Sequence, residues 1–164
     1  MDDYQSHYPV LMDYVSADSI TQYDKSIITV FGMVYDSLQK ESAEAAALLT
    51  FLGALGHWSI PFSTLRRMGE FDTQPQLVRT KEFDALRNVL VDETLLRVRL
   101  SQLYDACLVR VSKGPISRGS VSVNQAITQW IQQLVIPKKP EWLIYTGLAV
   151  TGNFSDKSRC VLLP

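Results

Sequence analysis

The sequence predicts a mainly α-helical fold that carries one small two-stranded antiparallel β-hairpin and an extra helix near its C-terminal end. Two observations predict this fold. Apolar residues recur with a period near 3.6 in most segments up to Ala106, which is typical of amphipathic helices. The period then falls to 2 in two short runs, CLVRV (107–111) and VSVN (121–124), and becomes helical again from Gln125.

The N-terminal part of the chain is predicted to supply a linker and then a long helix. Residues 1–24 form a helical linker in two short pieces, because Pro9 interrupts the pattern. Ser26 is the expected N-cap of the helix that follows. The apolar stripe of that helix has the spacing of one face: Ile27, Val30, Phe31, Val34 and Leu38.

A second helix, SAEAAALLTFLGAL (42–55), is apolar on nearly every side. Ser42 can cap its start, and Gly56 is the expected C-cap. A helix of this kind is normally buried, so we expect it at the centre of the fold. A shorter helix is predicted from about Pro61 to Met68, and residues 69–80 have the composition of a loop.

Two further helices, about Lys81–Val91 and Glu93–Ala106, precede the hairpin, which spans about residues 107–124. Another helix, Gln125–Val135, leaves the second strand of the hairpin. A lone hairpin is only marginally stable in water, so this one is expected to pack against the helices. We therefore assign residues 25–136 to one domain with a winged-helix-like arrangement.

Residues 137–164 follow that domain. Pro137 and Pro140 bracket a basic linker, and Glu141 to about Val150 form one extra helix. That helix can pack only against the preceding domain. The remaining residues, TGNFSDKSRCVLLP, are expected to be unstructured, and the whole region could be the start of a truncated helical repeat.

The composition is typical of a globular protein, with 46% hydrophobic residues, 20% charged residues and a net charge of −1. No apolar run approaches ~18 residues, and the N-terminus lacks the pattern of a signal peptide. We therefore expect a cytoplasmic protein without a membrane partner. Two cysteines, Cys107 and Cys160, are too few for a disulfide framework.

No catalytic residue, metal ligand or cofactor site is predicted. The sequence has neither a Walker A loop nor a dinucleotide-binding fingerprint, and its histidines and cysteines lie far apart along the chain. His57 follows a predicted helix end, where histidine commonly interacts with the terminal carbonyls. An enzyme with a site assembled around His57 is the least favoured hypothesis.

Charge is distributed unevenly along the chain. Residues 1–60 carry two basic and eight acidic residues, whereas residues 61–164 carry fourteen basic and nine acidic ones. Within residues 97–139 there are seven basic residues and a single acidic one, Asp105. The two halves can attract one another, or the basic half can face an anionic partner.

Binding to DNA is therefore the alternative function, since the hairpin would form a basic wing, and a basic wing suits contact with phosphates. Two features count against nucleic acid as a partner. The candidate recognition helix, residues 93–106, offers Gln102 as its main base-reading side chain, and the net charge of the chain is near zero. The hairpin supplies the three residues of the basic wing: Arg110, Lys113 and Arg118.

Residues 26–65 follow a recognisable pattern. It begins with Ser, an aliphatic pair and Thr, and continues with two aromatic positions and a Leu. The matching residues are Ser26, Ile27, Ile28, Thr29, Phe31, Tyr35 and Leu38. With its alanine-rich second helix, this run resembles the opening of the winged-helix region that follows the nucleotide-binding domain in fungal NB-ARC and NACHT proteins. Those proteins are signalling NTPases of the NOD-like (STAND) class.

The run SVSVNQAITQW (120–130) resembles a second part of that region. The family has a small residue, an aliphatic residue and a histidine, then an aliphatic residue and a Trp at three-residue intervals. Here Asn124 stands in place of the histidine, with Ile127 and Trp130 at the later positions. By the helical spacing, Trp130 is interpreted as a core residue, with a ligand platform as the alternative.

The resemblance implies a nucleotide-sensing role for Asn124, because the family's histidine contacts the bound nucleoside diphosphate. Asn124 keeps a hydrogen-bond donor at a helix N-terminus, where a phosphate can bind, but it cannot become cationic. A simpler alternative stays open, in which Asn124 only caps the helix.

The resemblance covers about residues 4–150 and implies the function. The chain would be a non-enzymatic regulatory or packing module of a signalling NTPase, without a cofactor of its own. It would dock on a P-loop nucleotide-binding domain, in the same chain or in a partner, and homo- or hetero-oligomers are compatible with this role. It also implies absent parts, a P-loop domain upstream and helical repeats downstream, so we expect a truncated product or a fragment.

Overall fold

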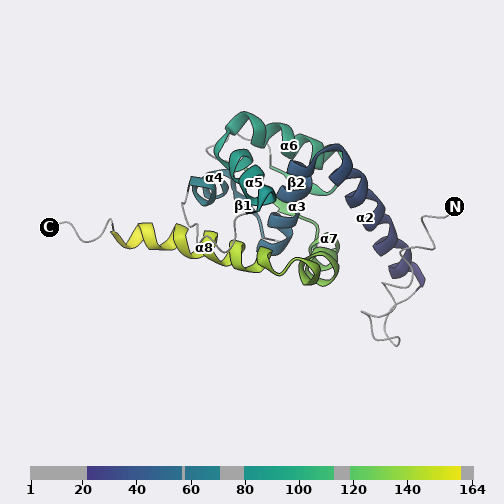
Figure 1. The fold of residues 1–164 in the computed structure, drawn as a ribbon. Helices are drawn as coiled ribbons and strands as arrows, with labels where there is room; N and C mark the ends of the chain where they lie inside the picture. The colour runs from purple at the N-terminus through teal and green to yellow at the C-terminus, as the bar shows by residue number, and fades with distance from the viewer. Residues whose placement is uncertain (1–21, 57, 71–79, 113–118, 160–164) are drawn as a thin grey trace.

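The structure is a computed structural model that describes residues 22–56, 58–70, 80–112 and 119–159, with side chains described between residues 28 and 151 of those ranges. The described residues are mainly helical, as predicted, with seven α-helices and a small three-stranded antiparallel sheet (Figure 1). In chain order the elements are α2 (Gln22–Glu41), α3 (Ala43–Leu55), β1 (Ile60–Pro61), α4 (Phe62–Glu70), α5 (Lys81–Val91), α6 (Glu93–Asp105), β2 (Val109–Val111), β3 (Ser120–Val123), α7 (Gln125–Trp130), a π-helical turn (Ile131–Val135), a 3-10 turn (Ile136–Lys138) and α8 (Glu141–Arg159). Of the linker predicted over residues 1–24, residues 1–21 lie outside the described residues, and residues 22–24 belong to α2 instead.

α3 is the central element, as its composition predicts. Every residue from Ala45 to Gly53 is buried, and α2, α5, α6, α7 and α8 all contact it. Both predicted caps are confirmed. The side chain of Ser42 accepts a hydrogen bond from the backbone N–H of Ala45 at 3.2 Å. Gly56 ends the helix with φ at 107°, a conformation that favours glycine because it has no Cβ.

α2 departs from the prediction in two ways. The predicted N-cap at Ser26 is wrong, because α2 begins at Gln22 and Ser26 lies inside it; the residues between them contain neither Gly nor Pro to stop the helix. Val30 is also misplaced in the predicted stripe, since it is 54% exposed. The face that packs on the core is rotated from the predicted one and is formed by Phe31, Val34, Tyr35 and Leu38.

The hairpin is confirmed, but the prediction of only two strands is wrong. β2 pairs antiparallel with β3, with Arg110 opposite Ser122, and β1 adds a third strand on the other side of β3. β1 has two residues, Ile60 and Pro61, too few to show a period of 2. Proline is tolerated there because β1 is an edge strand and a missing N–H breaks no ladder.

The helices between β1 and β2 follow the predicted ranges closely. α5 matches its predicted bounds, and α6 ends one residue before the predicted Ala106. Asp92 caps α6 by accepting hydrogen bonds from the N–H groups of Thr94 and Leu95. The predicted loop over residues 69–80 is wrong at its first two residues, because α4 continues to Glu70, and residues 71–79 lie outside the described part of the chain.

α8 packs on the same core, and its C-terminal half runs past the rest of the described fold (Figure 1). Trp142 and Ala149 are almost completely buried in a cluster with α3 and α5 residues. The prediction that residues from Thr151 onward are unstructured is wrong for residues 151–159, which continue the helix. None of the helices in the described ranges is long and apolar enough to span a bilayer.

Candidate functional site at the junction of α2 and α7

The junction of α2 and α7 brings together the aromatic residues of the two recognised sequence stretches. Trp130, at the end of α7, packs edge-to-face against Tyr35 with ring centres 5.3 Å apart, and against Phe31 at 6.4 Å. Trp130 is buried, so the prediction that it is a core residue is confirmed. Edge-to-face aromatic pairs of this kind stabilise a contact beyond the area they bury.

The other residues singled out from these stretches also fall at or near the junction. Leu38 and Ile127 are buried in the core, and Thr29 is buried on α2. Ser26 lies in the first part of α2, outside the residues whose side chains are described. The two stretches, almost a hundred residues apart in sequence, therefore form one contact surface between helices.

Tyr35 is fixed by a chain of hydrogen bonds that reaches into α3. Its hydroxyl lies 2.8 Å from Oγ1 of Thr50, and the Thr50 hydroxyl donates to the carbonyl of Ala46 at 2.9 Å. Because the Thr50 proton is used in that second bond, Tyr35 is the donor in the first. Burial raises the pKa of Tyr35 above its usual value, so the phenol is neutral at physiological pH.

A π-helical turn, Ile131–Val135, continues α7 and locks it to α3. Gln132 donates from Nε2 to the carbonyl of Gly53 at 3.2 Å. A Cβ on Gly53 would lie only 2.5 Å from Cδ1 of Ile131, so the two helices approach more closely than any other residue at position 53 would allow. Turns of this type are rare and are frequently found at functional sites.

A groove of about 250 Å³ lies between α2 and the segment that runs from Trp130 to Lys139. Its α2 wall combines apolar and polar side chains around Gly32. The facing wall is apolar at the π turn and cationic at its far end. The lining residues are Ile28, Thr29, Gly32, Tyr35, Asp36, Gln39, Trp130, Leu134, Val135, Lys138 and Lys139.

Asn124 occupies the exposed start of α7. Its side-chain oxygen accepts a hydrogen bond from the backbone N–H of Ala126 at 3.0 Å, so Asn124 caps the helix. This confirms the structural role that the sequence left open. The nucleotide-sensing role remains a prediction. The amide nitrogen of the same side chain is a donor that capping does not use.

The basic residues considered for DNA binding fall only partly within the described residues, and several of the described ones are paired with carboxylates. Arg110 is exposed on β2, whereas Lys113 and Arg118 lie outside the described residues. Three other cations of the region are paired with carboxylates, which lowers the positive charge available to a phosphate backbone. The pairs are Arg97 with Glu93 at 3.0 Å, Arg99 with Glu44 at 2.7 Å, and Lys139 with Glu82 at 2.7 Å.

Of the histidines and cysteines considered from the sequence, the structure describes only Cys107. His57 and Cys160 lie outside the described residues, and Cys107 is exposed just before β2. The part of the chain that the structure describes contains no group of three or more His, Cys, Asp or Glu residues able to hold a metal ion.

The groove itself was missed from the sequence. Ile28, Gly32 and Asp36 recur every fourth residue along α2, which places them on one helix face beside the apolar stripe. That spacing was the available signal. The facing wall depends on the π turn, which has no comparable sequence pattern.

Comparisons with protein-family models, with curated proteins and with solved structures found no match to this chain.

Proposed function

We propose that the chain is a non-enzymatic docking module of a signalling NTPase of the STAND type, and that it packs against a P-loop nucleotide-binding domain in the same assembly. Under this proposal α2, α3, α5, α6 and the β2–β3 hairpin form a winged-helix-like unit. Two features of the surface support a docking role: the outer side of α8 and the exposed start of α7.

The outer side of α8 is the observation that carries the proposal. One side of this helix buries Trp142 and Ala149 in the core. On the opposite side, Leu143 and Ile144 are 56% and 57% exposed, and Gly147 adds no side chain. A helix that is apolar on both sides is normally covered on both sides. The described residues cover only one, which supports a protein partner on the other.

The start of α7 supports the same role. Asn124 uses its side-chain oxygen to cap the helix, and its amide N–H groups point to no partner within the described residues. A helix N-terminus with a spare donor suits a phosphate held by a neighbouring domain. Serine caps a helix about as well as asparagine. Asn124→Ser should therefore leave the stability of the chain unchanged and weaken nucleotide-dependent docking, if Asn124 contacts the nucleotide.

Photo-crosslinking tests the proposed docking surface. A photoreactive amino acid is placed at position 143, with a matched control at Ser101 on the exposed side of α6, and the full chain is expressed in its native cells. The proposal requires a covalent product from position 143 that is absent from position 101, with partner peptides that include a Walker A motif. Equal products from both positions, no product, or a partner without a nucleotide-binding domain would overturn it.

Titration calorimetry tests the other half of the proposal, that the nucleotide belongs to the partner. Injecting ADP or ATP into the isolated chain should produce no binding heat. Micromolar affinity for either nucleotide would contradict the proposal, since the chain would then hold the nucleotide without help.

Binding to DNA is the second candidate, supported by exposed Arg110 on β2. The internal pairing of Arg97, Arg99 and Lys139 counts against it. Fluorescence anisotropy with duplex DNA at low salt decides between the two, because contact with phosphates produces affinity that falls steeply with salt. We expect no binding, and a strong salt-dependent signal would favour the DNA-binding function instead.

A further inference from the structure

The groove between α2 and the π turn is large enough for a small organic molecule. Its volume is about 250 Å³. An engineered apolar cavity of about 150 Å³ is sufficient to hold benzene. The groove can therefore take one ring together with a short chain of atoms, and it is smaller than the sites that hold drug-sized ligands.

One part of the groove is apolar and is lined by side chains that pack against one another. Trp130, Leu134 and Ile28 line it, and Trp130 is held in place by its ring contacts with Phe31 and Tyr35. Tyr35 adds a neutral phenol, because burial raises its pKa, and its hydroxyl is already hydrogen-bonded to Thr50. A ring or branched aliphatic group fits a surface of this kind.

The absence of a side chain at Gly32 keeps the α2 wall open. A Cβ built at Gly32 has no heavy atom within 4 Å, so the space next to this residue is empty. Glycine in the middle of a helix lowers helix stability relative to alanine. Gly32 is thus a helix position where a larger residue would fit without a clash, and where it would reduce the volume of the groove.

The far end of the groove carries one cation available to a ligand. Lys139 is paired with Glu82, with Nζ and Oε1 2.7 Å apart. Asp36 already has an interaction partner within the protein. Lys138 is exposed and has no ion-pair or hydrogen-bond partner among the described residues. Lys138 is therefore the charged group that remains for a bound molecule, and it attracts an anion.

We infer that this groove binds a small molecule with an apolar ring or branched body and a single carboxylate. The body lies against Trp130 and Leu134, next to Gly32, and the carboxylate accepts a hydrogen bond from the ammonium of Lys138. The π turn makes the site possible, because its first residue is buried against Gly53 while Leu134 and Val135 face the groove. This inference does not depend on the docking function proposed above.

Three probes with one body and different head groups test the inference: 4-phenylbutyrate, 4-phenylbutanol and 4-phenylbutylamine. Binding to the full chain is measured by titration calorimetry and by ligand-observed NMR. The carboxylate should bind about tenfold more tightly than the alcohol, as expected for one charge-assisted hydrogen bond, and the amine should bind most weakly.

Two variants, Gly32→Leu and Lys138→Met, locate the site, and a third variant serves as the control. Gly32→Leu should abolish binding of all three probes by filling the groove. Gly147→Leu is the matched control, because Gly147 is also a helix position with nothing within 4 Å of an added Cβ, and it lies outside the groove. Lys138→Met, at an exposed position where folding is not at risk, should make the carboxylate bind no better than the alcohol.

Circular dichroism establishes that each variant is folded before binding is measured. No binding of 4-phenylbutyrate at millimolar concentration overturns the inference. So does tighter binding of the amine, a carboxylate preference that survives Lys138→Met, or binding to folded Gly32→Leu that equals wild type.

Discussion

α3 and the first half of α8, up to Val150, both carry apolar residues on more than one side, but neighbouring helices cover them to different extents. α3 is enclosed, with nine consecutive buried residues from Ala45 to Gly53. α8 is enclosed on the side of Trp142 and bare on the side of Leu143 and Ile144. The same kind of sequence therefore has two outcomes. Where neighbouring helices cover every side, the residues form the core, and where they cover one side, the helix retains an exposed apolar surface on the other.

The largest expected effect tests whether the inner side of α8 is as integral to the core as α3 is. Trp142→Ala should lower the free energy of unfolding by about 3–5 kcal/mol, because it removes a large buried side chain. The indole ring packs edge-to-face on Phe83, with ring centres 4.7 Å apart. The indole N–H has no hydrogen-bond partner within the described residues, so the substitution loses packing and no hydrogen bond. Urea denaturation followed by circular dichroism measures the loss. A decrease in the free energy of unfolding of less than 1 kcal/mol would mean that α8 is not an integral part of the core.

The close contact between α3 and the π turn predicts the next effect. Gly53→Ala should destabilise the protein by about 1–3 kcal/mol, because the new methyl group would overlap Ile131. The control is Gly32→Ala on α2, where nothing lies within 4 Å; this change should stabilise by about 0.4–1 kcal/mol. Thermal unfolding of the two variants should shift in opposite directions. A shift of equal sign in both would contradict the packing described.

The hydrogen bond between Tyr35 and Thr50 predicts a smaller effect that depends on pH. Tyr35→Phe should cost about 1 kcal/mol at neutral pH. Burial raises the pKa of Tyr35 in the folded protein above its unfolded value near 10, so the stability linked to this shift is complete below pH 10 and is lost as pH rises through the folded pKa. The difference between wild type and Tyr35→Phe should therefore shrink above pH 10. A difference that stays constant up to pH 12 would exclude the shift.

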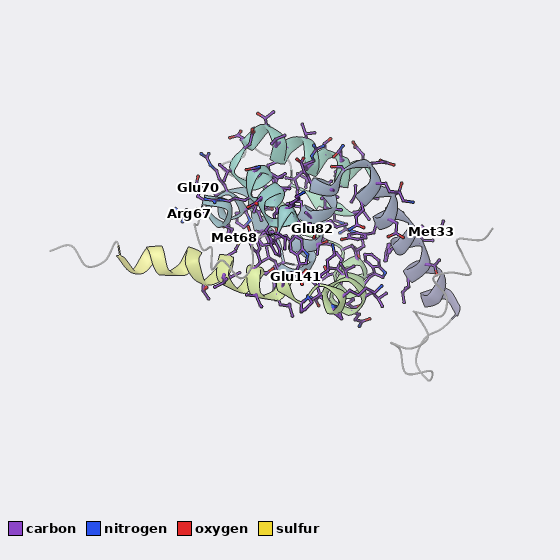
Figure 2. The ribbon with its side chains drawn as sticks, in the orientation of Figure 1. Met33, Arg67, Met68, Glu70, Glu82 and Glu141 are labelled. Atoms are coloured by element: carbon purple, nitrogen blue, oxygen red, sulfur yellow. The ribbon has the colours of Figure 1, made fainter. Side chains whose placement is uncertain are left out.

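The smallest effect on stability belongs to the outer side of α8. Leu143→Glu combined with Ile144→Glu should change the free energy of unfolding by no more than about 0.5 kcal/mol, because both side chains are exposed. Acidic residues near a helix N-terminus also interact favourably with its dipole. Met33, which projects from the outer side of α2 (Figure 2), offers a comparison: Met33→Glu should be similarly neutral. Destabilisation by several kcal/mol would show that the outer side of α8 is covered within the chain.

Much of the fold could be predicted because its signals are local. The caps at Ser42 and Gly56, the bounds of α5, and the change of period at the hairpin all depend on neighbouring residues. β1 could not be predicted in this way, since its two residues become a strand only by pairing with β3, about sixty residues later. The continuation of α8 past Val150 was missed because extending an existing helix adds one hydrogen bond per residue and needs no apolar pattern.

The candidate site was predictable only in part. The sequence singled out Phe31, Tyr35 and Trp130, and the structure brings these three rings together. The sequence did not predict that Gly32 and Lys138 line the same groove, because the position of Lys138 relative to α2 depends on the π turn. Side-chain identity predicts which residues can pack, whereas an empty volume is a property of how the helices are placed.

The most direct test of the proposed docking surface compares two affinities for the partner that crosslinking would identify: that of the wild type and that of the Leu143→Glu, Ile144→Glu double variant. We predict that the double variant binds at least a hundredfold more weakly, while its thermal unfolding midpoint equals that of the wild type. Equal affinity for the partner, with the variant folded, would contradict the claim that the outer side of α8 is the surface on which this protein docks.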